Sequence, residues 1–260
     1  MINFNKFYKL FNIISACLVV ISILLLLFKG LNFGVDFKGG TLIELRSSDK
    51  KINITSLRDS FSNMNLGDIS IKKFGNENDF LIKIEQKDTS ANAIEIIKNK
   101  LSDSIGSSFN FRRVENVGPK VSSELLKSSI IAIMLSLAAM LFYIWIRFEW
   151  QFSLGAILAL FHDVIITLGL FSLFNLEINL SIVAAVLTIV GYSMNDTVVI
   201  YDRVRENLKK FSSIKIFELT NISINETLSR TLITSVTTLL ALISIYLFGG
   251  EILKGFSLAM

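Results

Sequence analysis

Five long apolar stretches dominate the pattern of hydrophobic and polar positions along the chain. They cover roughly residues 11–28, 129–146, 152–174, 180–201 and 231–248. Each is long enough for an α-helix to cross the hydrocarbon core of a bilayer, which takes about 17–25 residues. After Lys254 another apolar stretch begins, and we expect it to be the start of a sixth helix that is cut short. The pattern predicts an α-helical polytopic membrane protein.

The segment between the first two apolar stretches, residues 30–128, has the composition of a soluble domain. Strand patterns with a period of two alternate with amphipathic helix patterns. The predicted strands are 41–46, 68–74, 80–85 and 108–117, and the predicted helices are 56–64 and 90–104. The order βαββαβ predicts an α+β domain of the ferredoxin-like kind. The expected division is therefore 1–29 for a tail and the first membrane helix, 30–128 for this domain, and 129–260 for the remaining helices.

The first apolar stretch has two interpretations. Lys6 and Lys9 precede it, as basic residues precede the apolar core of a signal peptide. The run of about 18 residues exceeds the 7–15 usual for such a core. No cleavage site with two small residues follows the run, and the flanking residues from Lys29 to Phe33 do not resemble one. We therefore expect a retained membrane helix.

Basic residues in the short loops predict the orientation, because cytoplasmic loops carry an excess of Lys and Arg. The side of the N-terminal tail carries Lys6, Lys9, Arg147, Arg203, Arg205, Lys209, Lys210 and Lys215. The loops on the opposite side carry one lysine, Lys254. We expect a cytoplasmic N-terminus and an external, periplasmic domain over residues 30–128.

The composition supports the membrane assignment and excludes several other classes. Hydrophobic residues make up 52% of the chain and charged residues 18%, with a mean hydropathy of +0.57. The net charge of +4 is modest and spread out, so nucleic-acid binding is not expected. Cys17 is alone and can form no internal disulfide. No nucleophile–base pair, metal-ligand spacing or phosphate loop is present, and we expect neither an enzyme nor a bound metal or cofactor.

Charged side chains lie inside two of the apolar stretches and at the start of a third. An ionised side chain there costs at least about 2.5 kcal/mol unless it is paired, hydrated or neutralised. Asp163, preceded by His162, lies roughly 16 Å from either end of its stretch, counting 1.5 Å per residue. Asp196, preceded by Asn195, lies roughly 24 Å from the outer end, and Arg230 roughly 28 Å. The similar depth predicts that Asp196 and Arg230 can pair if their helices are neighbours.

Each of these residues also has a structural interpretation. Arg230 could extend to the headgroups, and Asp196 could be a solvated helix-end residue packed with Arg203. His162 could hydrogen-bond to the backbone or to Ser or Thr. Gly191 and Ser193 would allow close helix packing. Taken together, the three charges favour an ion or proton pathway through His162, Asp163, Asn195, Asp196 and Arg230.

Four sequence motifs carry a resemblance to a known family. They are GVDFKGGT (34–41), VGPKVSSEL (117–125), FHDVIIT (161–167) and GYSMNDTVVIYDRVREN (191–207). The chain resembles the SecF family, membrane subunits of the bacterial SecDF protein-export complex. The first motif, with Gly34, Asp36, Gly39 and Gly40, is shared with SecD. The last motif, which contains Gly191, is the most specific.

The resemblance implies the RND superfamily fold in the bacterial inner membrane, with SecD completing a pseudo-symmetric unit. It further implies the SecYEG channel, YajC-like subunits, translocating unfolded polypeptide and membrane lipid as partners. The implied function is to use the proton motive force in late steps of protein export. Asp196 and Arg230 fall on positions that the family ties to proton conduction, whereas Asp163 enters by its depth alone. Sodium as the coupling ion, a small-molecule exporter and a passive scaffold of the channel stay open as alternatives.

Overall fold

The computed structural model describes residues 2–47, 54–62, 68–73, 78–85, 95, 99, 109–211 and 213–260. The chain divides into two compact units. One unit comprises Phe33–Ile130, and the other comprises Met1–Asn32 together with Ile131–Met260. They correspond to the soluble-like segment and to the apolar stretches, respectively.

The smaller unit contains a four-stranded antiparallel sheet. Its elements are α2 (Val35–Lys38), β2 (Gly40–Ser47), α3 (Ile54–Ser62), β3 (Asp68–Lys73), β4 (Asp79–Glu85) and β5 (Phe109–Val117). The strand order is β3-β4-β2-β5. Ile43 and Leu45 of β2 and Phe80, Ile82 and Ile84 of β4 occupy alternate positions of their strands. They are buried and pack with Leu57 and Phe61 of α3. The alternating pattern that predicts the strands thus also selects the side chains that form the core.

The predicted α+β class of this unit is confirmed, with shifted boundaries. α3 is described over Ile54–Ser62, so it includes residues before the predicted start at 56, and the predicted end at 64 lies outside the described residues. The predicted helix 90–104 lies outside the described residues, apart from residues 95 and 99. The ferredoxin-like arrangement therefore stays a prediction, although the four strands are those expected.

The glycine motif forms the entry into the sheet. Gly34 is the N-cap of the short helix α2, Asp36 lies in its first turn, and Gly39 and Gly40 join it to β2. Gly39 has φ of +82° and Gly40 has φ of +131°, a region that L side chains rarely adopt. A Cβ on Gly40 would collide with the carbonyl oxygen of Ile84 on β4, and one on Gly39 would lie 3.3 Å from that of Val117. The turn into the sheet therefore needs glycine at both positions.

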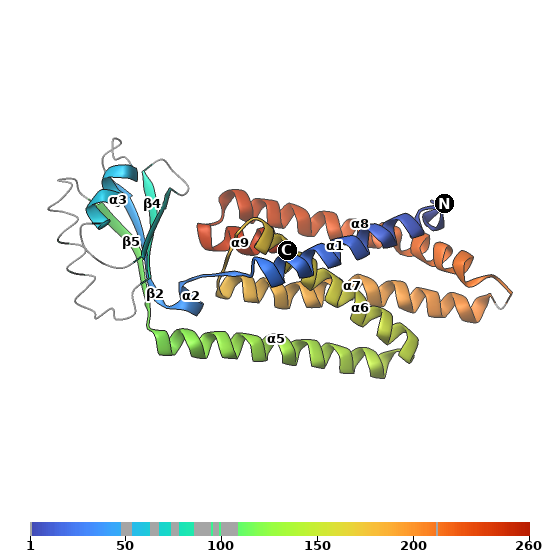
Figure 1. Cartoon of the computed structure of the whole chain (residues 1–260). Helices are drawn as coiled ribbons and strands as arrows, with labels where there is room; N and C mark the ends of the chain where they lie inside the picture. The colour runs from blue at the N-terminus through green and yellow to red at the C-terminus, as the bar shows by residue number, and fades with distance from the viewer. Residues whose placement is uncertain are drawn as a thin grey trace. The chain divides into compact units, whose positions relative to one another are not determined.

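The larger unit is helical, and Figure 1 shows its long helices side by side. Its elements are η1 (Phe4–Lys6), α1 (Tyr8–Phe28), α5 (Pro119–Arg147), α6 (Trp150–Leu173), α7 (Leu180–Lys210), α8 (Ile216–Phe248) and α9 (Glu251–Ala259). The first residues of α5 belong to the smaller unit. Two strands of two residues each, β1 (Asn32–Phe33) and β6 (Glu177–Ile178), lie outside the four-stranded sheet. Within the described residues, five helices are long and apolar enough to cross a membrane: α1, α5, α6, α7 and α8.

The predicted membrane helices are confirmed in number and order, but three of them extend well beyond the predicted bounds. α5 begins at Pro119 and not at 129, α7 continues to Lys210 and not to 201, and α8 begins at Ile216 and not at 231. The hydrophobic pattern marks only the part of a helix that suits lipid, and it misses polar turns that continue the same helix beyond that part. The predicted sixth stretch is helical in α9.

α7 is the most enclosed of the five long helices. One third of its apolar window is buried (33%), compared with 6% for α1. α6, α8 and α9 all pack against α7, and α1 packs against α6. A core of Ile144, Phe148, Ala156, Leu160, Val190 and Met194 joins α5, α6 and α7. The residues of α7 therefore have the best opportunity to meet side chains from other helices.

Close helix packing occurs at glycines other than the predicted one. A Cβ on Gly169 of α6 would lie only 2.8 Å from the Cα of Ser22 on α1, so the two helices touch there. At Gly191 a Cβ would have no neighbour within 4 Å. The prediction of close packing at Gly191 is therefore wrong for this structure, because this side of α7 faces open space.

Candidate functional site

A polar pocket lies beside α7 in the helical unit. Its volume is about 440 Å³. It is lined by His162, Asp163, Ile166 and Thr167 of α6, by Ile189, Tyr192, Ser193 and Asp196 of α7, and by Ala259 and Met260. The structure thus brings together three of the predicted pathway residues, His162, Asp163 and Asp196.

Helical spacing places these side chains on facing surfaces. On α7, Ile189, Tyr192, Ser193 and Asp196 are separated by three, one and three residues, so they share one face. On α6, Asp163 and Thr167 are one turn apart, and the Thr167 hydroxyl donates to the backbone oxygen of Asp163 at 2.8 Å. The polar side chains of the pocket therefore come from two regular helices, α6 and α7, whose backbones are unbroken there.

The Asp163 carboxylate is held from both helices. Ser193 Oγ of α7 donates to Asp163 Oδ2 at 2.6 Å. His162 Nδ1 lies 2.7 Å from Asp163 Oδ1 on the same helix. His162 thus contacts its neighbouring carboxylate, and the interpretation in which it bonds to the backbone or to Ser or Thr is wrong. Each carboxylate oxygen has a partner, and the side chain is still 39% exposed toward the pocket. Asp163 is anchored and accessible at once.

Asp196 lies one turn along α7 from Ser193 and is half-buried. In the described part of the chain, no hydrogen bond or ion pair reaches its carboxylate. The interpretation of Asp196 as a helix-end residue packed with Arg203 is wrong, because α7 continues to Lys210 and Arg203 pairs with Glu206 and Glu226. Its neighbour Asn195 is exposed and does not line the pocket. Asp196 therefore faces the pocket as a carboxylate without a compensating cation among the described residues.

Arg230 lies elsewhere. It is exposed and lines a second pocket of about 340 Å³ with Val199, Asp202, Arg203, Glu206, Glu226 and Thr227. Among the residues that the structure describes, no ion pair joins Arg230 to Asp196, so the predicted contact is not formed here. One turn further along α8, a hydrogen bond joins α7 to α8: the hydroxyl of Tyr192 donates to the backbone oxygen of Thr234 at 3.2 Å.

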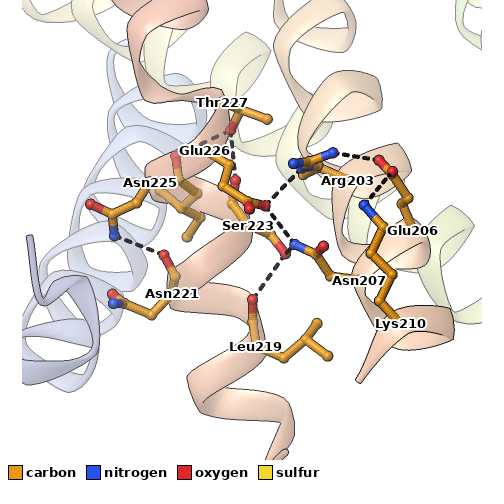
Figure 2. A network of polar contacts seen from close by, with 11 residues as sticks. Arg203, Glu206, Asn207, Lys210, Leu219, Asn221, Ser223, Asn225, Glu226 and Thr227 are labelled. Atoms are coloured by element: carbon orange, nitrogen blue, oxygen red, sulfur yellow. Dashed lines mark hydrogen bonds and ion pairs between the residues drawn. The ribbon is translucent and has the colours of Figure 1, made fainter. Parts of the chain in front are cut away.

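A second polar cluster on α7, which the sequence did not single out, is a network of paired charges (Figure 2). Arg203 Nε donates to Glu226 Oε2 at 2.7 Å, which joins α7 to α8. The buried Asn207 donates to the same Glu226 oxygen at 2.7 Å and to Ser223 Oγ at 3.0 Å. Glu206 is held by Arg203 at 2.5 Å and by Lys210 at 2.7 Å. We call these residues, Arg203, Glu206, Asn207, Lys210, Ser223 and Glu226, the α7–α8 network.

The N-terminal segment is attached to α8 beside this network. Asn225 accepts from the backbone N–H of Ile2 and donates to its carbonyl oxygen, both at 2.8 Å. The Asn221 side chain accepts from the N–H of Phe4 at 2.8 Å. The sequence shows the Arg203–Glu206–Lys210 spacing, which indicates local pairs on one helix. It shows no signal for the contacts that reach across helices.

No described residues form a metal centre, since no group of three or more His, Cys, Asp or Glu side chains converges in those ranges. The pocket beside α7 offers instead two carboxylates, an imidazole and three hydroxyls within membrane-length helices. Groups of this kind can exchange a proton or bind and release a small cation.

The comparisons with known proteins agree on one family. The family model described as "Protein export membrane protein SecD/SecF, C-terminal" matches residues 97–260, and the "SecD/SecF GG Motif" matches residues 24–50. Protein translocase subunit SecF of Rickettsia bellii is 45% identical over 98% of this chain and 84% of its own length. The SecF of Calditerrivibrio nitroreducens is also 45% identical, over 97% of this chain and 84% of its own length.

Solved structures support the same assignment. The crystal structure of SecDF from Thermus thermophilus, described as a translocon-associated membrane protein, superposes with a TM-score of 0.88 at 34% identity. A SecDF structure in a super-membrane-facing form superposes with a TM-score of 0.69 at 33% identity. Each match covers 99% of this chain and 35% of the SecDF chain, so this chain spans about a third of that protein's length.

Fold and site together define a multi-pass membrane protein with a small α+β domain between its first two membrane helices, built around titratable residues inside the helical unit. The chain belongs to the SecF family of protein translocase subunits. This is a family of accessory membrane subunits of protein export and not one of enzymes.

Proposed function

We propose that this chain uses the proton motive force to assist late steps of protein export, with the pocket beside α7 as part of its ion pathway. The observation that carries the proposal is the pair Asp163 and Asp196, two carboxylates from neighbouring membrane-length helices in one pocket. Ionised carboxylates are costly at this depth, and residues of this kind in membrane helices are functional by default.

The two carboxylates have different surroundings, which suits a relay. Asp163 accepts hydrogen bonds from Ser193 and contacts His162, whereas Asp196 has no compensating cation among the described residues. Asp196 can therefore take up or release a proton as its surroundings change, while Asp163 and His162 offer the next exchangeable position. In this proposal Arg230, on the neighbouring helix α8, moves toward Asp196 in another conformation and biases its charge.

The available energy suits mechanical work. One elementary charge that crosses the membrane releases about 2.3 kcal/mol per 100 mV. Because α6, α8 and α9 all pack on α7, a change of charge beside α7 can alter how these helices sit against one another. We propose that the helical unit converts this change into movement of the α+β domain, which acts on the translocating unfolded polypeptide.

The proposal includes the surroundings that the SecF family provides. The N-terminus is cytoplasmic, the α+β domain is periplasmic, and the membrane is the bacterial inner membrane. SecD is the partner that completes the helical bundle, as the two are joined in the SecDF chain that this chain matches over a third of its length. The SecYEG channel and YajC-like subunits are the further partners.

Export in membrane vesicles tests the ion pathway. Vesicles that carry the complete translocase with the wild-type chain, Asp196→Asn or Arg230→Ala are compared with and without a proton gradient, and with a sodium gradient in its place. We expect both variants to assemble normally and to lose the proton-dependent part of export. Glu218→Gln, a charge change in the first turn of α8 outside both pockets, is the matched control.

Two results would reject the proposal in different ways. Unchanged export in Asp196→Asn would favour a passive scaffold of the channel. Stimulation of the wild type by sodium alone would change the coupling ion.

The orientation has its own test, because Cys17 is the only cysteine. In a Cys17→Ala background, a cysteine at exposed position 58 of α3 should react with an impermeant maleimide from the periplasmic side.

A further inference from the structure

A third pocket lies where the end of α5 meets the C-terminal part of α7. Its volume is about 350 Å³, within the range of small-ligand sites, about 300–1,000 Å³. It is lined by Arg147, Asp202, Arg205, Glu206 and Lys209. None of the residues of the proposed ion pathway lines it.

Two tryptophans indicate the level of this pocket relative to a bilayer. Trp145 and Trp150 flank Arg147 in the chain, and they are 65% and 67% exposed. Exposed tryptophans of membrane proteins concentrate at the boundary between hydrocarbon and water. The end of α5 and the start of α6 therefore lie at the level of the lipid headgroups, and so does the pocket beside them.

The two arginines are held in place before any ligand arrives. Asp202 accepts from Arg147 Nη2 at 3.0 Å and from Arg205 Nη2 at 2.8 Å. Both guanidinium groups also lie over the ring of the buried Phe148, at 5.3 Å and 5.5 Å from its centroid. Stacking and ion pairing fix the planar donors, which lowers the entropy lost when an anion binds.

The pocket carries an excess of positive charge. The Glu206 carboxylate is compensated outside it by Arg203 and Lys210. Lys209 is exposed and forms no ion pair with any described residue. Arg147, Arg205 and Lys209 thus face Asp202 and the externally paired Glu206, and the five lining residues carry a formal charge of +1. The two arginines retain N–H groups that the bonds to Asp202 leave unused.

From these observations we infer that the pocket binds the phosphate headgroup of an anionic phospholipid. Fixed arginine donors suit phosphate oxygens, a mobile lysine adds a point charge, and the flanking tryptophans place the site where headgroups are found. The inference depends on the membrane-spanning helices and not on the proposed ion pathway, so the two can fail independently.

The tryptophans provide a direct reporter, because the chain has only these two. The full chain is reconstituted in nanodiscs, and its fluorescence is titrated with phosphatidylglycerol or phosphatidylcholine that carries brominated acyl chains, which quench tryptophan on contact. We expect phosphatidylglycerol to reach half-maximal quenching at a clearly lower mole fraction. Lys209→Gln, whose side chain has no ion pair to lose, should raise that mole fraction about fivefold.

Lys215→Gln removes the same charge outside the pocket and should leave the titration unchanged. Circular dichroism confirms that each variant is folded. Equal quenching of the wild type by the two lipids would overturn the inference, and so would an unaltered preference in Lys209→Gln. Loss of the preference when inorganic phosphate is added would show a site for free anions, which would overturn the assignment to lipid.

Discussion

Two polar clusters on α7 differ in how their charges are balanced. In the pocket beside α7, Asp163 and Asp196 face one histidine, and no described cation pairs with Asp196. In the α7–α8 network, which begins about two turns further along the same helix, every carboxylate has a basic partner at 2.5–2.7 Å. Carboxylates paired with basic side chains hold two helices in one arrangement. The free energy of a carboxylate without such a partner depends on how the surrounding helices are arranged. The comparison assigns stability to the network and ion coupling to the pocket.

The sharpest way to break this comparison is to neutralise one carboxylate in each cluster. For Asp163→Asn we expect the gradient-dependent part of export to fall at least about tenfold, because a charge that no longer moves gives up its share of about 2.3 kcal/mol per 100 mV. Export from vesicles, with and without an ionophore, measures the effect. Thermal unfolding in detergent should stay near that of the wild type.

Glu226→Gln is the matched change in the α7–α8 network. It should lower the unfolding temperature and leave gradient-dependent export of the folded protein intact, since Glu226 lines no part of the ion pocket. The assignment fails if Glu226→Gln abolishes export in a protein of normal stability.

A second prediction concerns the buried Asn207, which bonds to Ser223 and Glu226. Asn207→Leu keeps a similar volume but leaves these partners without their donor. We expect a loss of about 1–3 kcal/mol in the free energy of unfolding, measured by denaturant titration in detergent. Leu208→Ala, at an exposed neighbouring position, serves as the control and should change stability much less. Equal losses in the two variants would contradict the role of the network.

A substitution of Ser193, which lines the pocket beside α7, should have a smaller effect on export. Ser193→Ala removes the hydroxyl that donates to Asp163 Oδ2 at 2.6 Å. Because the Asp163 carboxylate stays in the pocket but is held less firmly, we expect gradient-dependent export to fall about fivefold, which corresponds to about 1 kcal/mol. Ser193→Thr keeps the hydroxyl and should restore most of the rate in the same vesicle assay. A threonine variant as slow as the alanine variant would show that packing and not hydrogen bonding is decisive.

The smallest expected effect is at the N-terminal segment. Asn225→Ala removes the two hydrogen bonds to the backbone of Ile2, and we expect a loss of about 1 kcal/mol. The segment should then detach more often, so that trypsin cleaves faster at Lys6 and Lys9. Unchanged cleavage would mean that the remaining contacts, such as Asn221 with Phe4, hold the segment by themselves.

Much of the fold could be predicted because its signals are local. Twenty apolar residues in a row specify a membrane helix whatever its neighbours are, and alternation along 80–85 specifies a strand with one buried face. The helix extensions at 119–128 and 202–210 escaped this method, since a polar turn of helix resembles a polar loop in composition. Depth along a helix predicted a pair between Asp196 and Arg230, which line different pockets, whereas the structure lines one pocket with Asp163 and Asp196.

The sequence by itself determined the membrane helices, the strands of the α+β domain and the presence of costly charges within the bilayer, because each follows from the chemistry of consecutive residues. Only the tertiary structure decided which charges meet. Depth is a one-dimensional quantity, and contact also depends on the rotation of each helix about its own axis. The rotation of α7 turns both Ser193 and Asp196 toward the pocket that Asp163 lines, whereas Arg230 of α8 lines another pocket. This rotation is set by how whole helix faces pack, which no single stretch of sequence contains.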